Sequence, residues 1–312
     1  MKRIIGFLRD FLREECKPGY VLVLLSFLAI AIWINYTFNF ETRMRLASWG
    51  SPLAIVWYIL FYGVPFTFAM GTYALWYRRT DIFRSRQFWI LSAATLLILG
   101  INGGFVWHVS PIKAMVAPQL QYFVLRCSNN LVSAIIYFSL VTVTWWIVDR
   151  KRIPLYGLRA ESLDPRPFFL LLLLVAPLIL WASFQPDFLR KYPRYTGADI
   201  ASAYGIPAAF PTGVFELFYG LDFVTTEFFF RGFMVLSFAR LMGRGSVFPM
   251  IAVYCFLHFE KPLAEAISSI FGGLVLGVIS YSTRSIYGGV IVHLGVAWMM
   301  EIAAFLQLAF RA

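Results

Sequence analysis

The sequence predicts an all-α, polytopic transmembrane helical bundle of about eight to nine spans. Of its 312 residues, 60% are hydrophobic and 14% are charged, whereas a soluble domain is nearer half apolar and a quarter charged. The apolar residues form long blocks, and a helix of about 20 such residues crosses the ~30 Å hydrocarbon core. The blocks are apolar all round instead of alternating with period two, so they favour helices over barrel strands.

The first sixteen residues predict a basic amphipathic helix that lies on the cytoplasmic headgroups. Its apolar residues are Ile4, Ile5, Phe7, Leu8, Phe11 and Leu12, and its basic residues are Lys2, Arg3, Arg9 and Arg13. No small-residue cleavage site follows an apolar run of signal-peptide length, so we expect no cleavable signal here.

Nine apolar segments follow this helix, and each is an expected span. They cover residues 20–38, 53–76, 88–107, 121–148, 167–184, 213–241, 246–258, 264–281 and 286–310. The seventh is too short for a full crossing, which indicates a broken or partly buried segment. The expected count is therefore eight or nine.

The lysines and arginines set the expected orientation, because cytoplasmic loops carry an excess of them. With the N-terminus in the cytoplasm, 17 of them fall on the inner side and 8 on the outer side. We therefore expect an integral multi-pass protein of the cell (plasma) membrane with a cytoplasmic N-terminus. The net charge of +11 reflects this topology and does not indicate nucleic-acid binding. The three cysteines have no zinc-type spacing and imply no disulfide framework.

A polar linker near residue 150, Asp149-Arg150-Lys151-Arg152 followed by Pro154, predicts a division into two parts. Residues 1–150 would hold the amphipathic helix and four transmembrane helices. Residues 151–312 would form the second domain, whose motifs lie within 213–303. A long loop at 185–212 carries four prolines and is expected at the outer interface.

Charged and imidazole side chains within the apolar segments of the second part predict a functional site, because such groups in lipid usually face a partner or a cavity. Glu227 and Arg231 are four residues apart on one helix face and can pair. His258 ends the seventh segment and His293 lies in the ninth. Imidazole titrates near neutral pH and ligates metals, so two converging rings suit acid–base or metal-assisted hydrolysis. A purely structural ion pair and satisfied core histidines are the alternatives.

The motif residues resemble the CAAX prenyl endopeptidase and bacteriocin-processing family of intramembrane proteases. The run is Thr226-Glu227-Phe228-Phe229-Phe230-Arg231-Gly232, then Tyr254-Cys255-Phe256-Leu257-His258, then His293. That family shows Glu-Glu-x-x-x-Arg, Phe-x-x-x-His and His-x-x-x-Asn or Asp on successive helices, and the resemblance covers roughly residues 155–312. It implies cleavage of peptide bonds inside the membrane, with a glutamate that activates water and two assisting histidines. Carried over, Glu227 pairs with Arg231, and the histidines are His258 and His293.

Two positions depart from the family pattern. Thr226 occupies the place of the water-activating glutamate, and Ala297 that of the final Asn or Asp. A threonine hydroxyl is no general base near pH 7, and alanine has no polar group. Spacing leaves three substitutes open. Glu227 itself is one, if Arg231 pairs elsewhere, for example with Glu216. The others are Glu301 and Glu260.

Three functions are open on this basis: an intramembrane endopeptidase, a catalytically degenerate relative that binds or regulates without cutting, and a transporter. A transporter would more often show two related halves, and none is found. The candidate cofactor is zinc, with His258 and His293 as candidate ligands and Glu227 or Glu301 to complete the three usual at catalytic zinc. The expected partners are a peptide or membrane-protein substrate and the lipid bilayer, with no nucleic acid.

Overall fold

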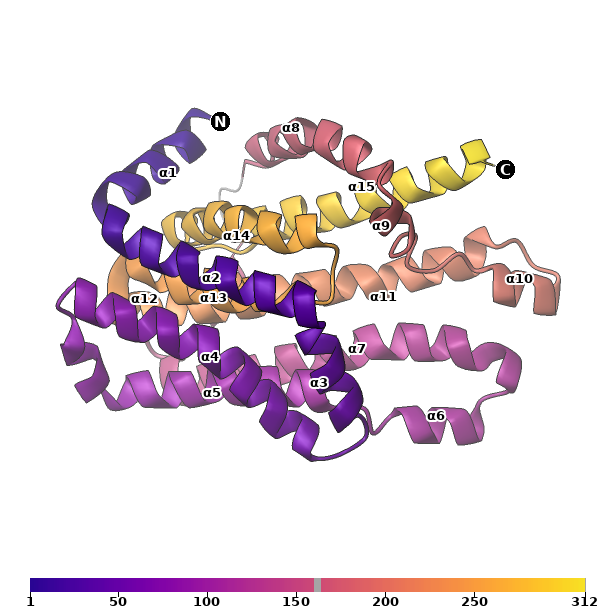
Figure 1. Cartoon of the computed structure of the whole chain (residues 1–312), viewed down its shortest axis with the longest axis horizontal. Coiled ribbons are helices and arrows are strands. Elements are labelled where there is room, and N and C mark those ends of the chain that lie inside the picture. The colour runs from indigo at the N-terminus through magenta and orange to yellow at the C-terminus, as the bar shows by residue number, and fades with distance from the viewer. Residues whose placement is uncertain (160–163, 312) are drawn as a thin grey trace. The chain divides into compact units, whose positions relative to one another are not determined.

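All nine predicted spans are helical in the computed structural model, which describes residues 1–159 and 164–311 (Figure 1). Residues 160–163 and 312 lie outside the described part, as does the side chain of Arg311, which the sequence placed on the outer side. The corresponding helices are α2 (Pro18–Phe38), α4 (Leu53–Trp76), α5 (Arg86–Gly104), α7 (Pro118–Thr144), α8 (Arg166–Ser183), α11 (Ala209–Glu227), α13 (Val247–Leu257), α14 (Leu263–Thr283) and α15 (Tyr287–Arg311). No strand occurs in the described residues, so the all-α fold class is confirmed.

Seven helical segments in the described part of the chain are long and apolar enough to cross a membrane. Two predicted spans are not among them. The sixth, residues 213–241, is divided among α11, η4 and α12. The seventh is α13. Its 11 residues extend only ~16 Å. Residues 247–256 are all buried, so α13 meets protein on every side, as expected of a helix that is hydrophobic all round. A short helix at membrane depth is tolerated where protein surrounds it.

Shorter elements connect the spans. They are α1 (Lys2–Glu15), α3 (Phe40–Ser48), η1 (Thr80–Arg84), α6 (Val109–Met115), η2 (Trp145–Asp149), η3 (Leu155–Gly157), α9 (Pro186–Leu189), α10 (Ala198–Tyr204), η4 (Phe228–Ser237), α12 (Phe238–Met242) and η5 (Gly243–Ser246). The predicted N-terminal helix is thus present as α1. It buries Ile4 and Phe11 and leaves Ile5 and Leu12 exposed.

The chain forms two compact units that interleave along the sequence. The first unit comprises Met1–Phe105, Phe138–Leu163 and Glu227–Gly289, and the second comprises Val106–Tyr137, Asp164–Thr226 and Val290–Ala312. The domain boundary near residue 150, which was inferred from the polarity of the linker, stays a prediction.

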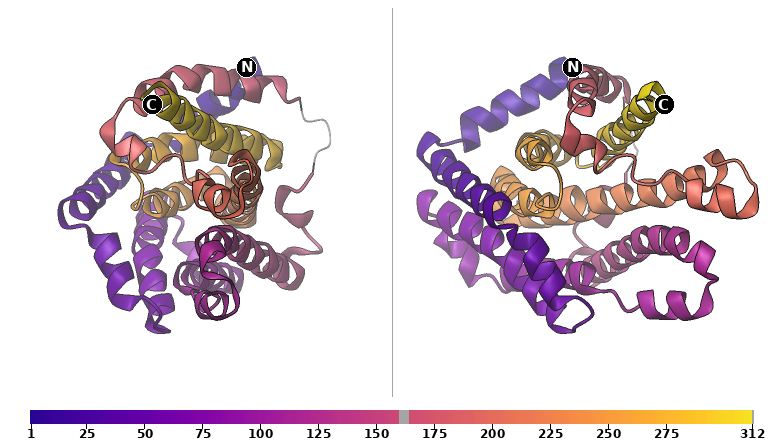
Figure 2. Two further views of the ribbon diagram at one scale, coloured as in Figure 1. Left: turned by 90° about the vertical axis from the view of Figure 1, so that its right-hand side faces the viewer. Right: turned by 45° about the vertical axis from the view of Figure 1, so that its right-hand side comes forward.

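Helix α13 is the centre of the first unit, where it packs against α4, α14 and η4. Figures 1 and 2 show α4 and α5 alongside each other and α14 next to α13. Small residues at four-residue spacing let α14 approach closely. A Cβ on Gly277 would lie 2.5 Å from Met250 Cε, and one on Gly273 3.3 Å from Tyr254. A Cβ on Gly272, by contrast, would meet nothing within 4 Å. This is the tight packing that small residues permit between membrane helices.

The second unit contains two aromatic clusters. One cluster joins Cys127, Tyr195, Phe215, Tyr219 and Ala297. The other joins Phe188, Tyr192 and Ala304. Because Phe188, Tyr192 and Tyr195 come from the predicted loop at 185–212, that loop is packed onto helices of its own unit.

Candidate functional site

The candidate site lies where α11 passes into the π-helical segment η4, in the first unit. Glu227 is the last residue of α11, and Arg231 lies inside η4. Every residue of η4 is buried. Isolated π-helical turns are rare and often occur at functional sites. Gly232 permits this packing, since a Cβ there would lie 2.6 Å from the Tyr156 carbonyl oxygen. The linker around Tyr156 therefore rests directly on η4.

Glu227 and Arg231 form a buried ion pair. Arg231 Nη1 lies 3.0 Å from Glu227 Oε1, and both side chains are 0% exposed. Removing one partner of such a pair leaves the other charge buried and uncompensated, which usually costs about 3–5 kcal/mol. The pairing is the one that four-residue spacing predicts, and it connects the chemistry of Glu227 to the fold of η4.

Helix α13 adds two rings to this pair. The Arg231 guanidinium carbon lies 4.0 Å from the centre of the Tyr254 ring, within the range of a cation–π contact. The His258 ring packs edge-on to the same Tyr254 ring, with centroids 4.5 Å apart and planes at 64°. Glu227, Arg231, Tyr254 and His258 thus form one continuous row, which we call the Glu227–His258 row.

The tautomer of His258 follows from its backbone contact. Nδ1 lies 2.9 Å from the carbonyl oxygen of Tyr254, one helical turn earlier. A carbonyl oxygen only accepts hydrogen bonds, so Nδ1 carries the proton. In the neutral ring Nε2 then keeps its lone pair, which makes it the nitrogen for proton transfer or ligation.

Helix α2 holds the turn that follows His258. The Asn35 amide donates to the Phe259 carbonyl at 2.9 Å, and the Tyr36 hydroxyl donates to the Lys261 carbonyl at 2.7 Å. These contacts span more than two hundred residues of sequence. The N-terminal part of the chain therefore supports a site whose motif residues all lie in the C-terminal half.

The first turn of α15 closes over Glu227. A Cβ on Gly289 would collide with Glu227 Oε2. Glycine at this position therefore leaves room for the paired carboxylate, and any side chain there would displace it. Sequence reasoning gave Gly289 no part in the site, because a glycine carries no charge or polarity that would mark it.

A second buried carboxylate braces η3 and α12 in the first unit. Asp149 is 0% exposed and lies 2.5 Å from Arg240 Nη1. It also accepts hydrogen bonds from the Tyr156 hydroxyl at 2.9 Å and from the Gln87 amide at 3.3 Å. Tyr156 is the residue whose carbonyl abuts Gly232. Sequence reasoning missed this network because Asp149 stands in a run of charges that is typical of a solvated linker.

His293 belongs to the second unit and sits on α15. Its ring packs edge-on to Phe223 of α11, with centroids 4.6 Å apart and planes at 74°. Whether it meets the Glu227–His258 row stays a prediction. Glu301, one of the open substitutes, is 3% exposed and accepts hydrogen bonds from the Arg194 backbone N–H at 2.9 and 3.2 Å. Its carboxylate thus holds the segment that carries Tyr195.

The two residues that depart from the family pattern, Thr226 and Ala297, are both buried. Thr226 is 7% exposed at the end of α11. Ala297 is 4% exposed and lies in the apolar cluster with Tyr195, Phe215 and Tyr219.

The zinc prediction depends on how many protein ligands are available. Catalytic zinc usually has three protein ligands. In the residues that the structure describes, no group of three or more His, Cys, Asp or Glu side chains is placed to hold a metal ion. Zinc binding by His258 and His293 stays a prediction, and we assign no chemical step to a metal.

Fold and site together define a polytopic helical membrane protein with a buried, ionisable site on its C-terminal helices. The family model described as "Type II CAAX prenyl endopeptidase Rce1-like" matches residues 206–299. This region contains Glu227, Arg231, His258 and His293, so the resemblance of the C-terminal half to CAAX-type intramembrane proteases is confirmed. A comparison with curated proteins and one with solved structures found no match.

Proposed function

We propose that this protein is an intramembrane endopeptidase that cleaves peptide or membrane-protein substrates at a site within the bilayer. The observation that carries the proposal is the Glu227–His258 row, whose Glu227–Arg231 pair is fully buried, inside the region matched by the Rce1-like model. Burying a paired Glu and Arg beside a half-buried imidazole is costly in a structure that needs only packing. A role in chemistry accounts for their presence.

His258 is the proposed general base. Its Nδ1–H is held by the Tyr254 carbonyl, so in the neutral ring the basic lone pair is on Nε2. Water then attacks the peptide carbonyl carbon while its proton passes to Nε2. The same proton passes to the leaving amine nitrogen when the C–N bond breaks. In this scheme Glu227 and Arg231 are positioning residues that hold α13 through the Tyr254 ring.

Glu227 is the alternative base, since Thr226 stands where the family has its first glutamate. The sequence left this role open only if Arg231 paired elsewhere, and the observed Glu227–Arg231 pair favours His258 over Glu227. His293 is proposed as the second imidazole of the site, as the family pattern implies. We further propose a cytoplasmic N-terminus and a location in the cell membrane, which the distribution of lysine and arginine supports.

The test uses purified full-length protein in lipid vesicles with three reporter peptides: one with a prenylated C-terminal cysteine, one leader peptide and one membrane-anchor segment. We expect His258→Ala and His293→Ala to lower kcat/KM on the cleaved reporter by roughly 10²–10⁴-fold, the range for loss of a general acid or base. His108→Ala is the matched control and should leave the rate unchanged. Activity that survives both site substitutions would remove the proposed site.

A further measurement separates the two candidate bases. If His258 is the base, His258→Ala removes the acidic limb of the pH–rate profile, and Glu227→Gln lowers kcat while keeping that limb. Unchanged cleavage by Glu227→Gln would eliminate Glu227 as the base. A chelator added to wild type tests the zinc prediction independently.

A catalytically degenerate relative that binds without cutting is the second candidate. The observation that favours it is Ala297, buried among apolar residues where the family has Asn or Asp. This candidate predicts no cleavage of any reporter by wild type. It also predicts that a membrane peptide which binds to wild type binds equally well to His258→Ala.

A further inference from the structure

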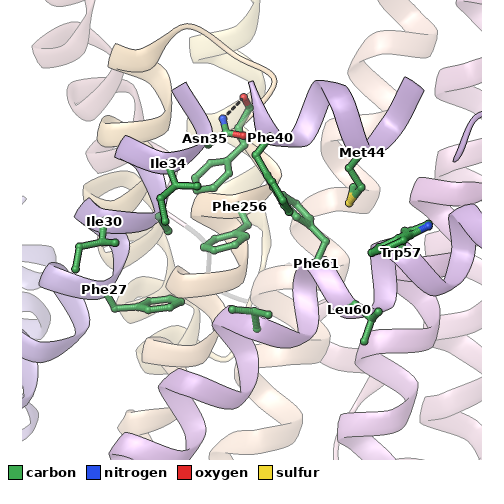
Figure 3. Close-up of a pocket in the computed structure, with 13 residues that line it drawn as sticks. Phe27, Ile30, Ile34, Asn35, Phe40, Met44, Trp57, Leu60, Phe61 and Phe256 are labelled. Atoms are coloured by element: carbon green, nitrogen blue, oxygen red, sulfur yellow. Dashed lines mark hydrogen bonds between the residues drawn. The ribbon is translucent and has the colours of Figure 1, made fainter. Parts of the chain in front are cut away.

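A lipid-facing groove in the first unit lies apart from the Glu227–His258 row. We define the α2–α4 groove as the cavity of about 390 Å³ between α2, α3, α4 and the end of α13 (Figure 3). Ile30 and Ile34 of α2 form one wall, and Leu60 and Val64 of α4 form the other. These four side chains are 39–58% exposed. Since α2 and α4 are both long and apolar enough to span a membrane, the groove opens toward hydrocarbon.

Aromatic rings form the floor of the groove. Phe61, Phe256 and Phe259 are each 5–6% exposed, and neighbouring ring centroids are 4.4–6.0 Å apart. The floor is therefore a fixed, packed surface and not a gap left by loose side chains. Phe256 and Phe259 flank His258 in sequence, so the floor of the groove includes part of the segment that carries His258.

The groove lining offers little to a polar ligand. Apart from the indole N–H of Trp57, Asn35 carries the only polar side-chain atoms among the residues lining the groove. Its amide nitrogen donates to the Phe259 carbonyl at 2.9 Å, and its side-chain oxygen accepts from the Glu41 backbone N–H at 3.0 Å. With both polar atoms of Asn35 engaged, a ligand gains mainly apolar contacts. The groove therefore suits a hydrocarbon chain.

The α3 end of the groove carries charges of both signs, and Glu260 also lies near Glu41. Helix α3 lies between the spans α2 and α4 and carries charges, so it sits at the headgroup level. Met44 lines the groove, and the neighbouring Arg43 is exposed. Arg45 is engaged by Glu41 at 3.3 Å. Arg43 is thus placed where the headgroup of a lipid would lie if its chain entered the groove.

The length of the groove suits one acyl chain. From Ile34 to Phe27 it runs about 10 Å along α2, which fits within the ~15 Å depth of one leaflet.

We propose that the α2–α4 groove is a binding site for one acyl chain of an anionic phospholipid, whose phosphate is bound by Arg43. The proposal uses none of the residues assigned to peptide cleavage, so it stands or falls separately from the proposed function. Bound lipid would buttress the Phe256–Phe259 segment that carries His258.

The test uses full-length protein in phosphatidylcholine vesicles that contain phosphatidylglycerol with a photoactivatable acyl chain. After illumination, peptide mass spectrometry locates the adducts. We expect adducts concentrated on residues 27–34 and 57–64. Ala31→Phe and Val64→Phe each fill the groove and should abolish those adducts, whereas Leu22→Phe, on α2 but outside the groove, should not. Using two groove variants keeps the test valid if one of them misfolds.

Headgroup recognition is tested with Arg43→Gln. One basic residue near an anionic surface corresponds to about a fivefold change in binding, so we expect unlabelled phosphatidylglycerol to compete about fivefold less well in this variant. Phosphatidylcholine should compete weakly with wild type. Adducts spread evenly over all lipid-facing helices would overturn the proposal. So would competition by a prenylated peptide that is stronger than competition by phosphatidylglycerol, because the groove would then belong to the substrate.

Discussion

Arg231 is the residue whose side chain connects the parts of the candidate site. It has no exposed surface, pairs with Glu227 at 3.0 Å and stacks on Tyr254 at 4.0 Å. It therefore joins η4 to α13 through one ionic and one aromatic contact. Both contacts lie in a low-dielectric interior, where an unpaired polar or charged group costs more free energy than it does in water.

Substitutions at this pair should be non-additive. We expect Arg231→Met alone and Glu227→Gln alone each to destabilise the protein by about 3–5 kcal/mol, because each leaves an uncompensated buried partner. The double variant should be more stable than Arg231→Met. Unfolding in detergent micelles, followed by circular dichroism, measures the difference. Additive losses would show that the pair is not coupled.

The residue scale also shows what spacing can predict. The Glu227–Arg231 pair followed from four-residue separation, because residues so spaced share a helix face. The ion pair is present although the helix becomes π-helical at Phe228, between the two residues. The proton on His258 Nδ1 was not predictable, since it depends on where the Tyr254 carbonyl points.

At the scale of elements, η4 and the linker at Tyr156 form one packed unit. The Tyr156 carbonyl abuts Gly232, and the Tyr156 hydroxyl donates to Asp149, which also pairs with Arg240. The linker that the sequence presents as polar is therefore folded under the site helix. Substitutions in this linker should therefore shift η4 and, with it, the position of Glu227.

Gly232→Ala tests this packing. Its Cβ would lie 2.6 Å from the Tyr156 carbonyl oxygen and 3.3 Å from Ile286 Cγ2, so we expect about 1–3 kcal/mol of destabilisation from overpacking. Gly272→Ala in α14 is the matched control, because its Cβ meets nothing within 4 Å. The control should be neutral or slightly stabilising. Thermal unfolding of both variants in the same detergent makes the comparison, and equal midpoints would contradict the close approach.

The end of α1 should make stability depend on pH. Burial raises the pKa of Glu15 above its ordinary value of 4.5, with Arg244 opposing the rise. A carboxyl whose pKa is raised by folding stabilises the protein fully below the unfolded pKa. That contribution is lost as pH rises through the folded pKa. The unfolding midpoint should therefore fall over this interval.

Glu15→Gln should flatten that dependence, because the amide resembles the protonated carboxyl. Asp10→Asn, on the same helix, serves as the control and should keep the wild-type pH profile. Unfolding midpoints from pH 4 upward measure both profiles. An unchanged slope in Glu15→Gln would show that another group is responsible.

At the scale of the whole molecule, topology is the property that sequence statistics predict and that side-chain labelling can check. The positive-inside count places Arg84 in the cytoplasm and Lys113 outside. In a background with the three native cysteines replaced by serine, an impermeant maleimide should label Lys113→Cys on intact cells. It should label Arg84→Cys only after permeabilisation. The reverse pattern would place the N-terminus outside.

The class of the molecule and the position of its helices follow from the sequence because hydropathy and helical periodicity are local properties. All nine apolar segments are helical, and the short seventh segment is buried as its length implied. The resemblance of the C-terminal half rests on motifs carried within single helices, which is why it too was visible without coordinates.

Folding alone decides which distant groups meet. Asn35 and Tyr36 hold the turn after His258, Gly289 makes room for Glu227, and Asp149 serves η3 and α12 instead of solvent. None of these contacts leaves a periodic signal, because each joins residues from separate elements whose approach is set by packing and by the need to satisfy buried polar groups.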